Sequence, residues 1–202
     1  MSAAEFWKGE GGNAYVDRNQ SEALLASYTA MWAKILQRTR DVRTVLEVGA
    51  NIGMNLEAIR RLMPEVHREA IEPNESAAEA LSKRGVTVHR KLAQEPWEVD
   101  ASFDLVFTRG VLIHIPQQHL DAVYSNLYMH SHRYVMVAEY FSKARTMISY
   151  RGHNSLLWKA DFASEMLDIY RDLSVVDYGF IWSRDPVAPQ DDVTWTLMEK
   201  QG

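Results

Sequence analysis

The chain has 202 residues, of which 47% are hydrophobic and 24% are charged, a composition typical of one globular domain with a substantial core. Its formal net charge of −5 argues against broad nucleic-acid binding, which usually needs a basic face, although a local basic pocket is compatible with it. The absence of cysteine excludes disulfides, thiolate metal sites, cysteine nucleophiles and iron–sulfur clusters.

The first forty residues are predicted to form an arm followed by a helix. Residues 1–19 mix glycine, aromatic and charged side chains, which is typical of an irregular arm. Between residues 20 and 38, apolar side chains recur at helical spacing, and Ser21 can cap that helix. The apolar stripe consists of Leu24, Tyr28, Met31, Trp32, Ile35 and Leu36. We therefore divide the chain into an N-terminal arm and helix (1–40) and a main domain (41–202).

The next hundred residues alternate between short apolar runs and helical segments. Proline and glycine residues mark the ends of several helical segments. The predicted strands are 44–48, 69–72, 86–88, 103–107 and 134–138, and the predicted helices are 54–62, 75–83 and 116–130. Strands that alternate with helices predict right-handed crossovers and a parallel sheet with helices on both of its faces.

The pattern changes after the fifth predicted strand. A predicted loop at 140–155 precedes a helix at 160–170 and two further strands at 174–182 and 193–199. A hairpin of these two strands makes the last strand antiparallel to the others. The predicted fold is therefore α/β, with a Rossmann-like, mostly parallel seven-stranded sheet, helices on both faces and an antiparallel last strand.

The strongest chemical signal is the turn Glu47–Gly53 between the first predicted strand and the helix that follows it. Gly49 allows a sharp turn and a close approach of the backbone to a ligand, and Gly53 lets the start of the helix pack near the strand. The spacing differs from the dinucleotide fingerprint G-x-G-x-x-G, because Asn51 and Met54 stand where its second and third glycines belong. A pyrophosphate would lack its usual close backbone contact, which disfavours a dinucleotide.

Glu72 ends the second predicted strand, nineteen residues after Gly53. A carboxylate at this position can accept both hydroxyl groups of a ribose, as it does in dinucleotide-binding folds. Considered alone, a glutamate at a strand end is better explained as a solvent-exposed residue. Together with the glycine turn, it favours a nucleoside ligand beyond the carboxyl ends of the strands.

The form E-x-G-x-x-x-G resembles the first motif of class I methyltransferases that use S-adenosylmethionine (SAM), where the loop packs against the amino-acid end of SAM. The resemblance implies SAM as cofactor and S-adenosylhomocysteine (SAH) as product. It implies adenine contacts after the third strand and methionine contacts after the fourth; for Arg109 a salt bridge at the loop tip is the alternative. The implied cofactor residues are Glu47, Gly49, Ala50, Asn51, Gly53, Glu72, Leu92, Ala93, Thr108, Arg109 and Gly110.

The whole chain also resembles a narrower family, the pseudaminic acid biosynthesis-associated methylases. The matching segments include Trp7–Gly9, Leu46–Asn55, Phe103–Phe107, Gly110–Ile115, Ala138–Tyr140, Tyr150–His153, Asp177–Phe180 and Arg184–Pro186. The resemblance implies a link to nonulosonic acid sugars, but it does not identify the methyl acceptor.

Loops at the carboxyl edge of the sheet carry the candidates for the acceptor site. Three side chains can orient an acceptor or take a proton from it: His114, Tyr140 and His153. Four more are candidate substrate-binding residues, two of them arginines that can clamp a carboxylate or phosphate: Glu139, Tyr150, Arg151 and Arg184. For His114 the alternative is a histidine that is hydrogen-bonded beneath a loop. For Tyr140 it is packing, and for Glu139 it is a salt bridge to a nearby arginine. For Arg151, His153 and Arg184 it is scattered surface charge.

The N-terminal arm supplies two further cofactor candidates. Arg18 can pair with the carboxylate of SAM, and Tyr15 can cover the cofactor. We expect the arm to order as a lid when SAM binds, because closure over a bound ligand excludes water. The alternative is an arm that packs on the core for stability alone.

The sequence thus favours a SAM-dependent methyltransferase that acts on oxygen or nitrogen of a small polar, anionic acceptor. A non-catalytic SAM-binding module and an NAD-dependent oxidoreductase are the alternatives. Nucleic acid and membrane are not expected as partners, and no metal site is predicted. With neither a secretory signal nor a long apolar run, a cytoplasmic protein is expected. The acceptor, the need for a general base and the oligomeric state stay open.

Overall fold

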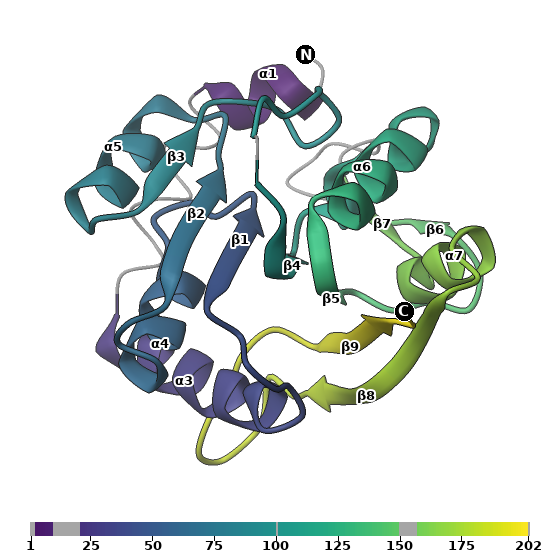
Figure 1. The fold of residues 1–202 in the computed structure, drawn as a ribbon. Helices are drawn as coiled ribbons and strands as arrows, with labels where there is room; N and C mark the ends of the chain where they lie inside the picture. The colour runs from purple at the N-terminus through teal and green to yellow at the C-terminus, as the bar shows by residue number, and fades with distance from the viewer. Residues whose placement is uncertain (1–2, 10–20, 100, 150–156, 202) are drawn as a thin grey trace.

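The computed structural model describes residues 3–9, 21–99, 101–149 and 157–201. Its central feature is a seven-stranded sheet with the order β3-β2-β1-β4-β5-β9-β8 (Figure 1). The strands are β1 (Thr44–Val48), β2 (His67–Ile71), β3 (Thr87–His89), β4 (Phe103–Arg109), β5 (Ser131–Glu139), β8 (Leu173–Ile181) and β9 (Val193–Lys200). Strands β1 to β5 pair in parallel, whereas β9 is antiparallel to both β5 and β8. The predicted sheet and its antiparallel last strand are confirmed.

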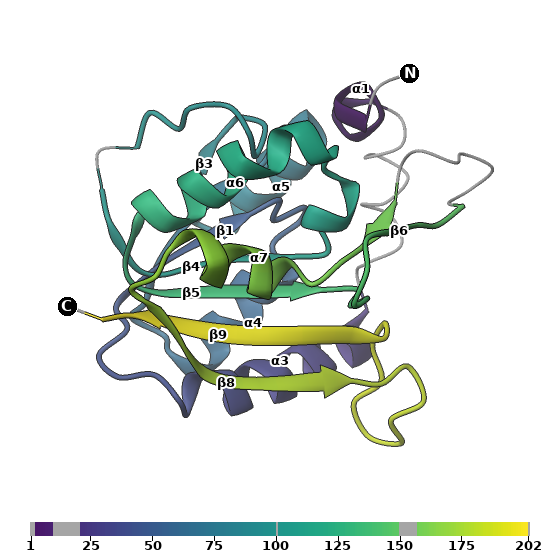
Figure 2. The same cartoon turned by 90° about the vertical axis from the view of Figure 1, so that its right-hand side faces the viewer.

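Helices cover both faces of this sheet (Figures 1 and 2). Helices α3, α4 and α5 lie on one face, and α6 and α7 lie on the other. The helices are α1 (Ala3–Lys8), α3 (Glu22–Leu36), α4 (Met54–Leu62), α5 (Glu75–Lys83), the 3₁₀ helix η1 (Leu112–His114), α6 (Gln117–Met129) and α7 (Phe162–Ile169). Ser21 caps α3 as predicted, because its hydroxyl oxygen accepts the N–H of Leu24 at 3.1 Å.

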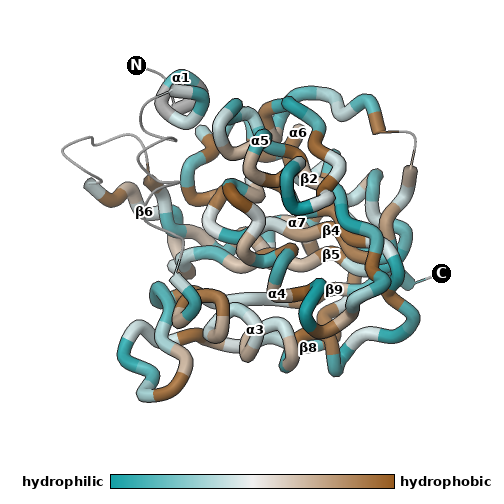
Figure 3. Tube along the Cα trace, turned by 90° about the vertical axis from the view of Figure 1, so that its left-hand side faces the viewer, coloured by the Kyte–Doolittle hydropathy of each residue, from teal (hydrophilic) through white to brown (hydrophobic). Residues whose placement is uncertain are grey.

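The sheet separates two apolar cores, since successive side chains of a strand point to opposite faces. Trp32, Ile35 and Phe107 belong to the core beneath α3 and α4. Leu46 and Val135 belong to the core beneath α6 and α7. Because both faces of the sheet are covered, its central strands are apolar on both sides. Figure 3 shows hydrophobic segments along β4 and β5 between the helical layers.

Several predicted boundaries of strands are wrong by a few residues. β2 begins at His67 rather than 69, β3 spans Thr87–His89 rather than 86–88, and β5 begins at Ser131 rather than 134. The added residues are mostly polar. Their backbones pair with a neighbouring strand, as His67 does with Thr44, and this pairing does not require an apolar side chain.

Two segments predicted as irregular contain regular structure. Helix α1 lies within the predicted arm, and β6 (Thr146–Met147) lies within the predicted loop. β6 forms a small antiparallel sheet with β7 (Trp158–Lys159), which lies beyond the predicted loop. Among the described residues, no helix combines the length and apolar character needed to cross a membrane.

Candidate active site

A pocket opens at the carboxyl ends of β1, β2 and β4, where α1 also lies (Figure 1). Its volume is about 780 Å³ when the solvent-filled mouth is included, a size that suits a small organic ligand. Six of the predicted site residues line it: Gly49, Leu92, Ala93, Arg109, Gly110 and His114. Other lining residues were not among the predicted site residues, and they include Trp7, Ile71, Pro73 and Val111.

The glycine turn forms one wall of this pocket and leaves no room for side chains. Gly49 and Gly53 have φ angles of +70° and +78°, in the left-handed region. A Cβ at Gly49 would lie 2.4 Å from Cγ2 of Val111, and one at Gly53 would lie 2.5 Å from Cδ2 of Leu81. Both positions therefore require glycine, the first against the loop after β4 and the second against α5.

Glu72 is buried directly after β2, with 6% of its surface exposed. Its Oε2 accepts the N–H of Asn51 at 2.7 Å, and its Oε1 accepts the N–H of Asn74 at 2.9 Å. Burial raises the pKa of Glu72, and these two N–H groups oppose that change. The structure therefore excludes a solvent-exposed glutamate. The carboxylate holds the turn next to the pocket-lining residues Ile71 and Pro73.

Glu47 lies at the end of a buried hydrogen-bond chain that starts in α3. Nε1 of Trp32 donates to Oδ1 of Asn55 at 3.0 Å, and Nδ2 of Asn55 donates to Oε1 of Glu47 at 2.6 Å. Within the described part of the chain, Oε2 of Glu47 has no hydrogen-bond partner. Burial raises the pKa of Glu47 to about 8. A buried acceptor without a partner is a natural contact for a ligand donor.

Arg109 ends β4 and is held by two neutral side chains. Its Nη1 donates to the hydroxyl of Tyr28 at 2.7 Å, and its Nη2 donates to Oε1 of Gln190 at 2.9 Å. Its buried Nε has no hydrogen-bond partner among the described residues. The alternative interpretation, a salt bridge at the loop tip, is not found in the described residues. Instead, the guanidinium acts electrostatically on the buried carboxyls of Glu47 and Glu139.

Glu139 ends β5 beneath the loop that carries η1. Its Oε1 accepts the backbone N–H groups of Val111 and Leu112, each at 3.0 Å, and its Oε2 accepts that of Ile113 at 3.4 Å. Only 4% of the residue is exposed, and burial raises its pKa to about 7. Glu139 thus fixes the segment that presents Val111 and His114 to the pocket.

We expect the stability difference between wild type and Glu139→Gln to depend on pH. The folded-state pKa of Glu139, about 7, lies above the ordinary value of 4.5. The contribution of this carboxyl to the free energy of unfolding therefore falls as pH rises from about 4.5 to about 7. Glutamine does not titrate, so wild type should lose ~2 kcal/mol relative to the variant between about pH 5 and about pH 8. Urea unfolding at both pH values measures this, and an unchanged difference would contradict it.

Comparison with known proteins identifies the family. The chain matches the family profile described as a methyltransferase domain over residues 17–167, which is more than half of its length. The chain belongs to this methyltransferase family. A search of curated protein sequences found no significant match to this chain.

Solved structures of other methyltransferases share its fold. The plantazolicin methyltransferase BpumL in complex with SAH has a TM-score of 0.65 and 12% identity, over 100% of this chain and 95% of that one. Magnesium protoporphyrin IX methyltransferase (ChlM) from Synechocystis PCC 6803 with bound SAM has a TM-score of 0.67 and 10% identity, over 100% of this chain and 98% of that one. The glycopeptide N-methyltransferase MtfA complexed with SAM has a TM-score of 0.62 and 13% identity, over 86% of this chain and 87% of that one. At these identities the likeness shows the fold alone.

The remaining predicted residues of this methyltransferase take different positions. Ala50 is buried in the turn, and the buried hydroxyl of Thr108 donates to the carbonyl oxygen of Val48 at 3.2 Å. Tyr140 is half-buried, with Nζ of Lys159 5.5 Å from the centre of its ring. Arg184 is exposed in the loop between β8 and β9. Five predicted residues lie outside the described part of the chain: Tyr15, Arg18, Tyr150, Arg151 and His153.

Proposed function

We propose that this methyltransferase uses SAM to methylate oxygen or nitrogen of a small polar, anionic acceptor and releases SAH. The observation that carries the proposal is the pocket at the carboxyl ends of β1 and β2, which is lined by Gly49 of the turn that the buried Glu72 holds through its hydrogen bond to Asn51. The structural neighbours solved with SAM or SAH support the choice of cofactor.

The residues present fit SAM at its ribose and at its amino-acid group. Each oxygen of Glu72 accepts one backbone N–H and keeps a lone pair for a ribose hydroxyl. The buried Oε2 of Glu47 and the buried Nε of Arg109 lack partners in the described structure, and they suit the ammonium and carboxylate of an amino acid. The sulfonium of SAM supplies an electrophilic methyl group.

The chain itself contributes orientation and exclusion of water. Val111 and Trp7 give the pocket apolar walls, which exclude water from a reaction in which charge is dispersed. His114 lines the pocket with 8% of its surface exposed, where it can orient the acceptor or take the proton that a hydroxyl or ammonium group loses when it becomes the nucleophile. Glu139 positions His114 through the backbone of η1.

The N-terminal arm and helix, residues 1–40, act as the lid in this proposal. Nδ2 of Asn74, which lies in the loop after β2, donates to the carbonyl oxygen of Trp7 at 3.3 Å. The ring of Trp7 lies 4.6 Å from that of His114, measured between centroids. Through Trp7, helix α1 therefore contacts both the loop after β2 and η1, and it lines the pocket.

Trp7→Ala is expected to weaken SAH binding about tenfold, because it removes an aromatic side chain from the pocket wall and opens the site to water. Isothermal titration calorimetry measures the change. Trp182→Ala is the matched control, since Trp182 is 49% exposed outside the pocket. Equal affinities of Trp7→Ala and wild type would rule out a lid that contacts the cofactor.

The proposed acceptor class has two supports. The similarity to the pseudaminic acid-associated methylases favours a nonulosonic acid or a related sugar acid, and the exposed Arg184 offers a guanidinium to an anion. A turnover screen with nonulosonic acids, other sugar acids and their uncharged counterparts tests it. Preference for the uncharged compounds would refute the anionic acceptor.

Calorimetry with SAH and with NAD tests the cofactor assignment. We expect saturable binding of SAH and none of NAD, since the turn lacks the second glycine of the dinucleotide fingerprint. Binding of NAD alone would favour an oxidoreductase. Binding of SAH without turnover of SAM across the acceptor screen would favour a non-catalytic module.

A further inference from the structure

Gln190 is the single buried residue of the loop 182–192, which joins β8 to β9. Its Oε1 accepts Nη2 of Arg109 at 2.9 Å, and its Nε2 donates to the carbonyl oxygen of Ser27 at 3.0 Å. One side chain therefore connects the loop, the end of β4 and the middle of α3. Gln190 is 7% exposed, so water does not easily replace these hydrogen bonds.

These contacts fix the orientation of the Arg109 guanidinium. The hydroxyl of Tyr28 accepts a hydrogen bond from Nη1. The ring of Tyr28 also lies beneath the guanidinium, whose Cζ is 4.4 Å from the centre of the ring. Gln190 accepts Nη2 from the other side. With both terminal nitrogens held, the orientation of the planar group is fixed, and Nε is the guanidinium nitrogen that has no partner among the described residues.

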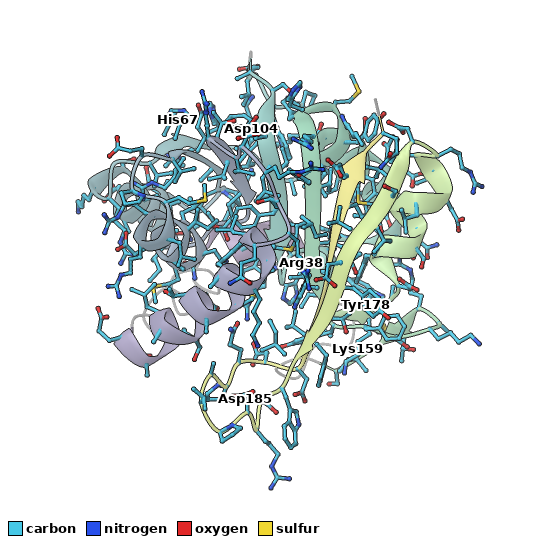
Figure 4. The ribbon with its side chains drawn as sticks, turned by 60° about the horizontal axis from the view of Figure 1, so that its bottom comes forward. Arg38, His67, Asp104, Lys159, Tyr178 and Asp185 are labelled. Carbon is cyan, nitrogen blue, oxygen red and sulfur yellow. The ribbon has the colours of Figure 1, made fainter. Side chains whose placement is uncertain are left out.

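The loop itself is ordered by aspartate side chains. Oδ1 of Asp185 accepts the N–H groups of Val187 and Ala188, at 2.9 and 2.8 Å. Oδ1 of Asp192 accepts the N–H of Ser183 at 2.8 Å. Figure 4 shows Asp185 at the end of the molecule opposite His67 and Asp104, which lie at the amino ends of β2 and β4. The loop thus lies at the same end of the sheet as the pocket.

We propose that Gln190 is a positioning residue of the cofactor site, which orients Arg109 toward the pocket and links the order of the β8–β9 loop to cofactor binding. The inference rests on the proposed function, because it assigns Nε of Arg109 to the carboxylate of SAM or SAH. A ligand carboxylate that fixes Arg109 also fixes its acceptor Gln190, and the coupling is reciprocal.

Two substitutions separate orientation of Arg109 from general packing. Gln190→Leu removes the acceptor and should weaken SAH binding about tenfold, which corresponds to ~1.4 kcal/mol. Gln190→Glu keeps an acceptor for Arg109, so its affinity for SAH should stay within about threefold of wild type. The control is Gln118→Leu, on the exposed surface of α6. Calorimetry with SAH measures all four proteins, and thermal unfolding confirms that each is folded.

Hydrogen exchange of the loop gives a second readout, independent of turnover. SAH should slow exchange at the amides of Ser183, Val187 and Ala188 in wild type and in Gln190→Glu. It should not slow them in Gln190→Leu at saturating SAH, because the link to Arg109 is absent.

The inference is overturned if Gln190→Leu binds SAH as tightly as wild type, or if the Glu and Leu variants lose affinity equally. It is also overturned if SAH protects the loop in Gln190→Leu as it does in wild type. A wild-type protein that fails to bind SAH at all would instead refute the proposed function, so the two failures are distinguishable.

Discussion

Glu72→Ala is expected to weaken SAH binding by at least about 100-fold, or ~2.7 kcal/mol. The substitution removes the acceptor proposed for two ribose hydroxyls. It also leaves the N–H groups of Asn51 and Asn74 without their carboxylate partner, which loosens the turn at the pocket. Calorimetry with SAH measures the loss of affinity.

A conservative variant and a surface control accompany this measurement. Glu72→Gln retains one carbonyl acceptor, so an intermediate affinity is expected. Glu79→Gln alters an exposed glutamate on α5 and should leave the affinity unchanged. Wild-type affinity of Glu72→Ala would show that the cofactor does not contact this carboxylate.

Gly49→Ala should lower the free energy of unfolding by about 3 kcal/mol and abolish measurable SAH binding. An alanine at a φ of +70° is strained, and its Cβ would lie 2.4 Å from Cγ2 of Val111. The pocket wall must then move, because the packed side chains around it cannot absorb the added volume. Urea unfolding and calorimetry measure the two effects.

Gly110→Ala and a double variant separate strain from collision. Gly110 has a φ of +67°, but a Cβ there meets nothing within 4 Å, so only the strain of about 1 kcal/mol is expected. Adding Val111→Ala to Gly49→Ala should recover the part of the stability that the collision costs. If Gly49→Ala is no less stable than Gly110→Ala, the close packing of Val111 on the turn is not what requires glycine.

The mostly parallel sheet could be predicted because short strand-like runs alternate with helical segments along the chain. The run Thr44–Val48 is buried on both faces of the sheet, so its composition alone indicates its position. The ends of the strands could not be predicted as well. His67 and Arg68 belong to β2 because their backbones pair with β1. Their side chains are polar and do not indicate a strand.

The parts of the site predicted from the sequence are those carried by one local motif. The glycine turn and Glu72 have a fixed spacing, which the fold converts into proximity. Gln190 lies 81 residues from Arg109 and 163 from Ser27, and no spacing rule connects the three. Glu139 was predicted as a substrate-binding residue, yet the structure pairs it with backbone N–H groups of the β4 loop.

The position of β9 has a consequence for the order of assembly. The final strand in the sequence is an interior strand of the sheet, inserted between β5 and β8. A nascent chain that has not yet produced residues 193–200 leaves the edge of β5 open and gives β8 no strand to join. The earlier strands therefore keep exposed backbone groups until residues 193–200 have been synthesised, a period in which edge-to-edge association competes with folding.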